Sequence, residues 1–231
     1  MGSSLTDRPL KLNRQRLRIR TLSGSLSRAR GLFVAAALAA FLAGCATAKP
    51  GPLLLHPVPT TRDKYSLSQG AIVFSGPDFT VSARPWDHRL VAEEFRSSGE
   101  PNPFGEDETA IGRFIFLKVR LENHSARTLV FNPMRSSLLR EGEAPKRPLE
   151  NSDLFVFADE ESAAAEARGR SFRRVSYDIT VTVRPGQELE RYLVFPAPED
   201  EVKQVDLEIA DLWHGSTSFD LRFGFEAFPG K

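Results

Sequence analysis

Alternation of apolar and polar residues with a period of two is the dominant pattern of this chain from residue 70 onward. The longest case runs from Val175 to Val183, where apolar side chains at odd positions alternate with Ser, Asp and Thr. Two further clear cases are Ile115–Glu122 and Phe219–Phe225. Strict alternation in segments rich in β-branched and aromatic residues is typical of strands with one buried face. The pattern therefore predicts three long strands.

Shorter segments of the same kind fill much of the remaining chain, and turn residues separate them. The segments are Ala71–Phe74, Phe79–Ala83, Thr128–Phe131, Leu154–Phe157, Glu190–Phe195 and Gln204–Ile209. The turn signals are Gly76-Pro77, Asn123-His124-Ser125, Arg184-Pro185-Gly186 and the prolines at 196 and 198. Many short antiparallel strands with one polar face predict an all-β fold, an immunoglobulin-like two-sheet antiparallel sandwich.

Two stretches interrupt the strand pattern and are expected to be insertions between strands. Residues 86–113 contain Trp86-Asp87-His88, a short helical segment at Leu90–Arg96 and a loop rich in Gly, Pro and acidic residues. Residues 159–170 favour a helix by propensity, with acidic residues first and arginine last, as the helix dipole prefers. The sandwich should thus carry short helical insertions.

A different pattern precedes the strands. Arg28 and Arg30 are followed by fourteen residues without a charge, Gly31 to Gly44. As a helix this stretch spans about 21 Å, which is shorter than the hydrocarbon layer of about 30 Å. A basic flank, a short apolar segment and small residues at its end are typical of a secretory signal peptide.

The end of this segment, Leu42-Ala43-Gly44-Cys45, resembles the lipobox of bacterial lipoproteins. The resemblance implies that Cys45 receives diacylglycerol on its sulfur, that residues 1–44 are removed, and that the new N-terminus carries an acyl chain such as palmitate. By the sorting rule that accompanies the resemblance, Ala46 at the next position favours the outer membrane, facing the periplasm, over the inner membrane.

Between Cys45 and the strands lies a segment without sustained periodicity. Residues 45–69 contain four prolines and are expected to form an extended, lipidated tether, with the folded domain at residues 70–231. Leu53-Leu54-Leu55 is the one apolar run in this tether. Docking of this run on the folded domain is the simpler expectation, and docking on a partner is the alternative.

Charge separates the leader from the rest of the chain. Residues 1–44 hold eight of the 31 basic residues and one of the 30 acidic residues, so 23 basic and 29 acidic residues remain and the rest carries a net charge of −6. An acidic domain argues against nucleic acid as a partner. Cys45 is the single cysteine, which excludes an intrachain disulfide and a cysteine-based zinc site.

The strand-and-turn pattern of the domain also resembles a known class. Residues 116–125, followed by 128–133, and the Val183–Gln187 corner, followed by 192–196, are similar to the immunoglobulin-like domains of uncharacterised bacterial envelope lipoproteins. The resemblance covers roughly residues 114–195 and concerns turns and core positions. It implies a fold and carries no catalytic residue with it.

Motifs for catalysis or metal binding are scarce. The chain has no Gly-x-Ser-x-Gly elbow, no His-Glu-x-x-His helix and no phosphate loop. Trp86-Asp87-His88 is the most suggestive grouping, because a carboxylate can orient an imidazole; the alternative is a polar loop that caps a strand end. Arg168, Arg170, Arg173 and Arg174 form the one basic cluster of the domain, either a solvated loop or a docking site for an anionic partner.

These observations predict a membrane-anchored envelope lipoprotein that acts as a non-catalytic binding or structural module. We expect one functional modification, lipidation of Cys45, with no catalytic, cofactor or metal site. The expected partners are the lipid bilayer and an envelope protein. Two alternatives remain open. One is an enzyme that acts on envelope polymers through a site near Trp86–His88, and the other is a carrier that holds an apolar ligand between the sheets.

Overall fold

The computed structural model describes residues 52–58, 63–105, 108–153, 163–198 and 202–230. All of them belong to one compact unit, Lys49–Lys231. The predicted signal peptide, residues 1–44, and the predicted lipidation site Cys45 lie outside the described residues, as does the predicted strand Leu154–Phe157.

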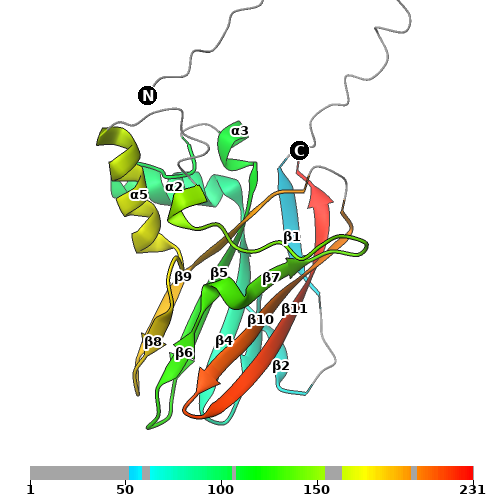
Figure 1. Ribbon diagram of the computed structural model, residues 1–231. Helices are drawn as coiled ribbons and strands as arrows, with labels where there is room; N and C mark the ends of the chain where they lie inside the picture. Colours follow the sequence, from blue (N-terminus) through cyan, green and yellow to red (C-terminus); the bar gives the residue numbers. More distant parts are fainter. Residues whose placement is uncertain (1–51, 59–62, 106–107, 154–162, 199–201, 231) are drawn as a thin grey trace, which may run out of the picture. The chain divides into compact units, whose positions relative to one another are not determined.

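Two antiparallel sheets build this unit (Figure 1). The first has the order β1-β11-β10-β6-β8, and β7 also pairs with β10; its strands are β1 (Leu53–Pro57), β6 (Leu129–Phe131), β7 (Ser136–Leu139), β8 (Val181–Val183), β10 (Gln204–His214) and β11 (Thr217–Pro229). The second has the order β2-β3-β4-β5-β9, with β2 (Tyr65–Ser68), β3 (Ala71–Ser75), β4 (Phe79–Trp86), β5 (Phe114–Asn123) and β9 (Glu188–Pro196).

The main hydrophobic core lies between the two sheets. Alternate residues of each strand point inward, as the period-two pattern requires: β5 contributes Leu117, Val119 and Leu121, and β11 contributes Leu221, Phe223 and Phe225, all buried. Aromatic rings of the two sheets meet edge-on, for example Phe79 of β4 and Phe219 of β11 at 5.0 Å between centroids. The all-β, two-sheet antiparallel sandwich predicted from the sequence is therefore confirmed.

A second hydrophobic cluster lies on the outer face of the β2–β9 sheet, under the helices. Helix α2 (His88–Ser98), the short α3 (Glu108–Ile111) and α5 (Ala163–Val175) surround it. Val91 and Phe95 of α2 and Phe172 of α5 pack there with Phe116 and Tyr192 of the sheet. Both predicted helical insertions are present, and α5 is displaced toward the C-terminus relative to residues 159–170, of which 159–162 are not described. The other helical segments among the described residues are the single turn η1 (Pro133–Arg135) and residues 151–153.

The predicted strand Val175–Val183 is mostly wrong. Helix α5 continues to Val175, and only Val181–Val183 form a strand, β8. Between them Ser176 forms a parallel bridge with Tyr192 of β9, so the chain passes from the edge of one sheet to the edge of the other. Tyr177 is buried in the core, whereas Ile179 is 69% exposed. The apolar–polar alternation of residues 175–183 therefore does not correspond to one continuous strand, because the start of the segment pairs with one sheet and its end pairs with the other.

The boundary predicted at residue 70 is also too late. Strand β1 pairs with β11 from Leu53↔Pro229 to Pro57↔Phe225, and β2 pairs with β3 from Tyr65↔Phe74 to Ser68↔Ala71. Leu53 and Leu55 pack against the main core. The leucine run thus docks on the domain, as expected, but as a strand of the sandwich. Residues 52–58 and 63–69 belong to the domain and not to a free tether.

Candidate functional site

Trp86, Asp87 and His88 lie where β4 ends and α2 begins. A hollow of about 220 Å³ opens beside them, between β1 and the ends of β4 and β5. Its lining consists of Pro52, Leu53, Leu54, Leu55, His56, Pro85, Trp86, Asp87, His88, Leu90, Phe114, Ile115 and Phe116. The grouping singled out in the sequence therefore borders a concave surface, which is the geometry that the enzyme alternative requires.

The contacts of Asp87 and His88 explain why they are adjacent. Asp87 is the N-cap of α2, and its Oδ1 accepts a hydrogen bond from the Arg89 backbone N–H at 2.8 Å. The same oxygen lies 3.0 Å from Nδ1 of His88, which is 6% exposed. Aspartate is a preferred N-cap because it satisfies a free N–H of the first helical turn. The polar pair thus caps a helix, whereas the structural alternative considered from the sequence was a strand cap.

The remainder of the lining offers little chemistry. Asp87 is the one carboxylate among the lining residues, and none of them carries a hydroxyl or thiol that could act as a nucleophile. Hydrolysis of a glycosidic bond requires two carboxylates in most enzymes, and acyl transfer requires an activated nucleophile. The polar side chains that line the hollow are consequently two imidazoles, the Trp86 indole and one capping carboxylate.

A charged cluster on the outer face of the β2–β9 sheet fastens α2. Lys118 of β5 places Nζ 4.1 Å from the centroid of Trp86 and 3.2 Å from Glu94 Oε2 of α2. Tyr192 of β9 donates its hydroxyl proton to the same carboxylate. Burial, together with this hydrogen bond to Glu94, raises the pKa of the Tyr192 hydroxyl well above its usual range. The cluster thus connects helix α2 to the sheet through the carboxylate of Glu94.

The structure brings together a second group that the sequence did not indicate. At the end of the sandwich that carries the β10–β11 hairpin, Ser125 Oγ lies 2.7 Å from His214 Nε2, and His214 Nδ1 lies 3.7 Å from Asp78 Oδ2. Ser125 and His214 are 89 positions apart, so no local pattern announces their contact. The residue types match a catalytic triad, and the geometry decides their role.

The geometry indicates that these residues connect neighbouring turns and do not form a catalytic triad. The distance of 3.7 Å from His214 to Asp78 exceeds a hydrogen bond. Ser125 Oγ also accepts the Arg127 backbone N–H at 3.0 Å and lies 2.8 Å from Asn123 Oδ1, so the hydroxyl is engaged inside its own turn. Asn123 donates from Nδ2 to the carbonyl oxygens of Arg127 and Val183 at 2.6 and 2.9 Å. These residues connect the β5–β6 turn to β8 and to the β10–β11 hairpin.

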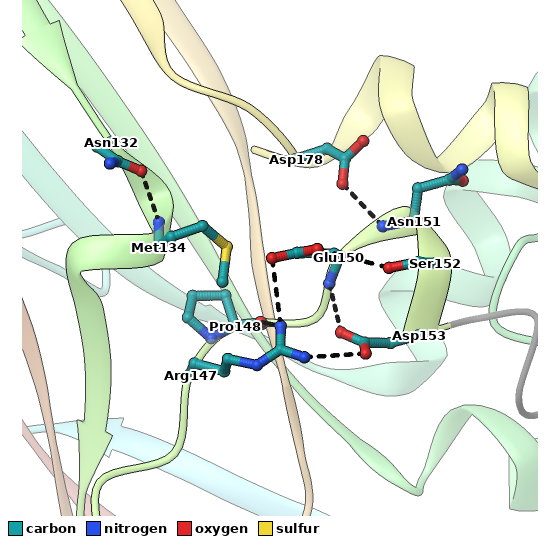
Figure 2. A network of polar contacts seen from close by, with 9 residues as sticks. All are labelled: Asn132, Met134, Arg147, Pro148, Glu150, Asn151, Ser152, Asp153 and Asp178. Atoms are coloured by element: carbon teal, nitrogen blue, oxygen red, sulfur yellow. Dashed lines mark hydrogen bonds and ion pairs between the residues drawn. The ribbon is translucent and has the colours of Figure 1, made fainter.

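A polar network organises the segment between β7 and α5 (Figure 2). Arg147 Nη2 donates to Asp153 Oδ1 at 3.0 Å, and the other oxygen of Asp153 accepts the Glu150 backbone N–H at 2.8 Å. The Asn151 backbone N–H donates to Asp178 at 2.7 Å, which joins this segment to the crossing segment before β8. Beside the network lies a hollow of about 370 Å³ lined by Pro145, Lys146, Arg147, Pro148, Leu149, Asp153 and Pro196.

The predicted basic cluster is partly neutralised by the fold. Arg174 forms an ion pair with Glu100, which follows α2 in the chain. Nη1 of Arg170 lies 3.8 Å from Oε2 of Glu166, one turn earlier in α5. Exposed pairs of this kind contribute little stability, but they lower the local positive potential. Two of the four arginines of the cluster on α5, Arg170 and Arg174, therefore lie near carboxylates of the described residues.

Within the described residues, no group of three or more His, Cys, Asp or Glu side chains is arranged to hold a metal ion. In the same part of the chain, no helix is both long and apolar enough to cross a membrane.

Comparison with known proteins adds little to this picture. No protein-family model matches the chain, and no curated protein matches it. A match among solved structures is the crystal structure of the yjhA protein from Bacillus subtilis, with 12% sequence identity and a TM-score of 0.26, covering 70% of this chain and 74% of that one. A similarity this low supports no inference about fold or function.

Proposed function

We propose that this protein is a lipid-anchored envelope lipoprotein whose β-sandwich acts as a non-catalytic binding or structural module. The observation that carries the proposal is the sequence Leu42-Ala43-Gly44-Cys45, which follows a basic flank and a short apolar segment and contains the single cysteine of the chain. Two or three acyl chains on one residue hold a protein stably on a bilayer, whereas one chain holds it marginally. In this proposal, Cys45 is the anchor and Ala46 directs the protein to the outer membrane.

The non-catalytic part of the proposal is supported by the way the polar side chains are used. Asp87 caps a helix, Ser125 and His214 clamp turns, and Lys118 with Tyr192 fastens α2. Each suggestive group among the described residues thus has a structural task. A rigid sandwich with such groups engaged suits a module that holds a partner by its surface, and the partner we propose is another protein of the envelope.

The anchor is tested by replacing Cys45 with alanine and following the protein in cells supplied with labelled palmitate. The proposal predicts that wild-type protein carries label and fractionates with membranes. The Cys45→Ala variant should accumulate as a larger, unlabelled precursor. Ala46→Asp is the matched control, because it should keep the label while shifting the protein to the inner membrane. Label on the Cys45→Ala variant, or its unchanged membrane fractionation, would refute the anchor.

The enzyme alternative has one observation in its favour, the hollow beside Asp87 and His88. Asp87→Asn separates the two functions, because asparagine is also a preferred N-cap but cannot act as a general acid or base. Incubation of isolated envelopes with wild-type and Asp87→Asn protein should release the same background of soluble fragments. Release by the wild type that the variant lacks would establish the enzyme and overturn the non-catalytic proposal.

The carrier alternative requires room for an apolar ligand between the sheets. Of the two hollows described above, one is bordered by β1 and by Ile115 at the margin of the main core, and the other is bordered by the Pro145–Leu149 segment. Extraction of purified domain with organic solvent, followed by mass spectrometry, should yield no lipid in stoichiometric amount. A lipid present at one copy per chain would favour the carrier.

Crosslinking in intact envelopes tests the proposed protein partner. Anchored wild-type protein and the unanchored Cys45→Ala variant should be crosslinked in parallel. The proposal predicts a discrete adduct with the anchored protein and its loss or strong reduction with the variant. The absence of any adduct from the anchored protein would contradict a role in an envelope assembly.

A further inference from the structure

Because β1 is part of the sandwich, the chain that connects the proposed anchor at Cys45 to the domain is short. The sequence pattern predicts a tether up to residue 69, but β1 begins at Leu53 and is paired along its length with β11. Seven residues, 46–52, lie between Cys45 and Leu53. Fully extended backbone covers at most about 3.6 Å per residue, so eight peptide steps reach no farther than about 29 Å. The start of β1 would therefore stay close to the membrane that holds Cys45.

Exposed apolar side chains flank β1 on both sides. On one side, Leu90 of α2 is 50% exposed and borders the hollow that β1 lines. On the other side, Phe228 of β11 is 44% exposed, stands opposite Leu54 in the register, and its ring contacts that of His56 at 5.1 Å. Figure 1 shows that the start of β1, the end of β11 and helices α2 and α3 lie at the same end of the sandwich.

The end of the sandwich opposite to the start of β1 carries two turns. The β10–β11 hairpin and the β5–β6 turn lie there (Figure 1), and their turn residues include Ser125 and Ser216. Trp213, beside the β10–β11 hairpin, is 44% exposed. It equals Phe228 in exposure and lies at the far end of β10, which makes it a natural internal comparison.

From this placement we propose that the surface formed by Leu54, Leu90, Phe228 and the hollow beside Trp86 rests on the lipid bilayer that holds the Cys45 acyl chains. The proposal depends on the lipid anchor of the preceding section. A short tether keeps the local concentration of bilayer surface high, so that even a small apolar surface is held against it. Leucine and aromatic side chains at the boundary of head groups and acyl chains are the usual contacts of proteins that lie on a membrane. The hairpin end then points away from the bilayer, toward a partner.

Site-specific labelling tests the orientation. In the lipidated protein, the sulfur of Cys45 is consumed by the anchor, so an introduced cysteine is the single free thiol. Leu90→Cys and Phe228→Cys report on the proposed contact surface, and Ser216→Cys reports on the far end; all three positions are exposed. Each variant is labelled with an environment-sensitive fluorophore and reconstituted into vesicles of phosphatidylethanolamine and phosphatidylglycerol that contain doxyl-labelled lipid.

The proposal predicts a blue-shifted emission and several-fold stronger quenching by doxyl lipid at residues 90 and 228 than at residue 216. Equal quenching at the three positions, or stronger quenching at residue 216, would overturn it. Failure of the anchor is recognised separately, because unsubstituted protein would then react with maleimide at Cys45 and would not float with vesicles. If Cys45 does not react with maleimide and the quenching still does not follow the predicted order, the proposed orientation is wrong while the anchor stands.

A matched pair of substitutions tests whether the apolar side chains themselves make the contact. In the labelled Leu90→Cys protein, Phe228→Asp should reduce the quenching at residue 90 by at least half. Trp213→Asp, at a position of equal exposure on the other end, should leave it unchanged. Equal effects of the two substitutions would show that Phe228 has no special role and would overturn the proposed contact surface.

Discussion

Asn123 joins the β5–β6 turn to the β8–β9 turn at one end of the sandwich. Its side chain is 1% exposed and is satisfied on both sides, since Nδ2 donates to two carbonyl oxygens and Oδ1 accepts from Ser125. Its backbone also bonds to the β8–β9 turn, where Gly186 has a positive φ of 71°. The Asn-x-Ser pattern read from the sequence as a turn is therefore a junction of these two turns.

Replacement of Asn123 tests this junction. Asn123→Ala leaves the carbonyl oxygens of Arg127 and Val183 without their side-chain donor, and we expect a loss of about 2–4 kcal/mol of unfolding free energy. His124→Ala, at the exposed neighbouring position, should change it by less than about 0.5 kcal/mol. Urea denaturation of both variants measures the difference. A loss below about 1 kcal/mol for Asn123→Ala would contradict the role of the junction.

Two tyrosines make the stability sensitive to alkaline pH. Burial raises the pKa of both Tyr177 and Tyr192 above their usual value near 10. In the unfolded chain both ionise near pH 10, whereas in the folded chain both stay protonated. The stabilisation is complete below pH 10, and it is lost as the pH rises, by about 1.4 kcal/mol per pH unit for each tyrosine.

Chemical denaturation between pH 9 and pH 11 checks this expectation. Tyr192→Phe should reduce the slope of unfolding free energy against pH above pH 10 by about 1.4 kcal/mol per unit. Its lost hydrogen bond to Glu94 should lower stability at neutral pH by about 1 kcal/mol. An unchanged alkaline slope in the variant would mean that Tyr192 ionises in the folded protein.

At the scale of elements, the segment before β8 shows what alternation can and cannot specify. Tyr177 points into the core, where its ring meets Phe131 edge-on at 5.0 Å and its hydroxyl lies 2.9 and 3.1 Å from the carbonyl oxygens of Leu189 and Val119. Ile179, two positions later, is exposed because the chain is then crossing between the sheets. Period two predicts which residues share a side, but not which sheet receives them.

A pair of variants separates these two positions. Ile179→Ala should leave the unfolding free energy within about 0.5 kcal/mol of wild type, because the side chain is already in solvent. Tyr177→Phe should lower it by about 1–2 kcal/mol, because it removes a buried hydrogen bond without creating a large cavity. Thermal and urea unfolding give both values. Similar losses for the two variants would indicate a regular strand through residues 175–183.

Most strands could be predicted from the sequence, and the failures have physical causes. β3–β6 and β9–β11 follow from local alternation, since each has one face on the core. β1, β2 and β7 are short edge or side strands, and the prolines around β1 suggested a spacer. At the candidate site, Asp87 and His88 are neighbours in the chain and could be found. Ser125 and His214 meet through a long-range packing of hairpins, so their contact could not be found.

The place of β1 in the sheet is tested by truncation. A chain that begins at residue 70 lacks β1 and β2, which exposes the edge of β11 and removes Leu53 and Leu55 from the core. We expect it to lose about 3 kcal/mol or more relative to a chain that begins at residue 52. A chain that begins at residue 45 should match the latter. Equal stability of all three chains would restore the long tether predicted from the sequence.

At the scale of the whole molecule, the leader and the sandwich have separate proposed tasks. We propose that the leader and Cys45 determine where the protein is held, and that the sandwich, with a net charge of −6 counted from residue 45, supplies a surface close to the membrane. The polar groups that resemble catalytic sites serve helix capping and turn packing in the described residues. We propose that the role of such a molecule depends on where it is held and on which partner binds its surface.

The central claim is that Cys45 becomes the acylated N-terminus, and the mass of the mature protein tests it most directly. Protein extracted from membranes with detergent should yield an N-terminal fragment that begins at Cys45 and carries the added mass of a diacylglyceryl group and an amide-linked acyl chain. An N-terminal fragment that begins before Cys45, or one with a free Cys45 thiol, would contradict the account.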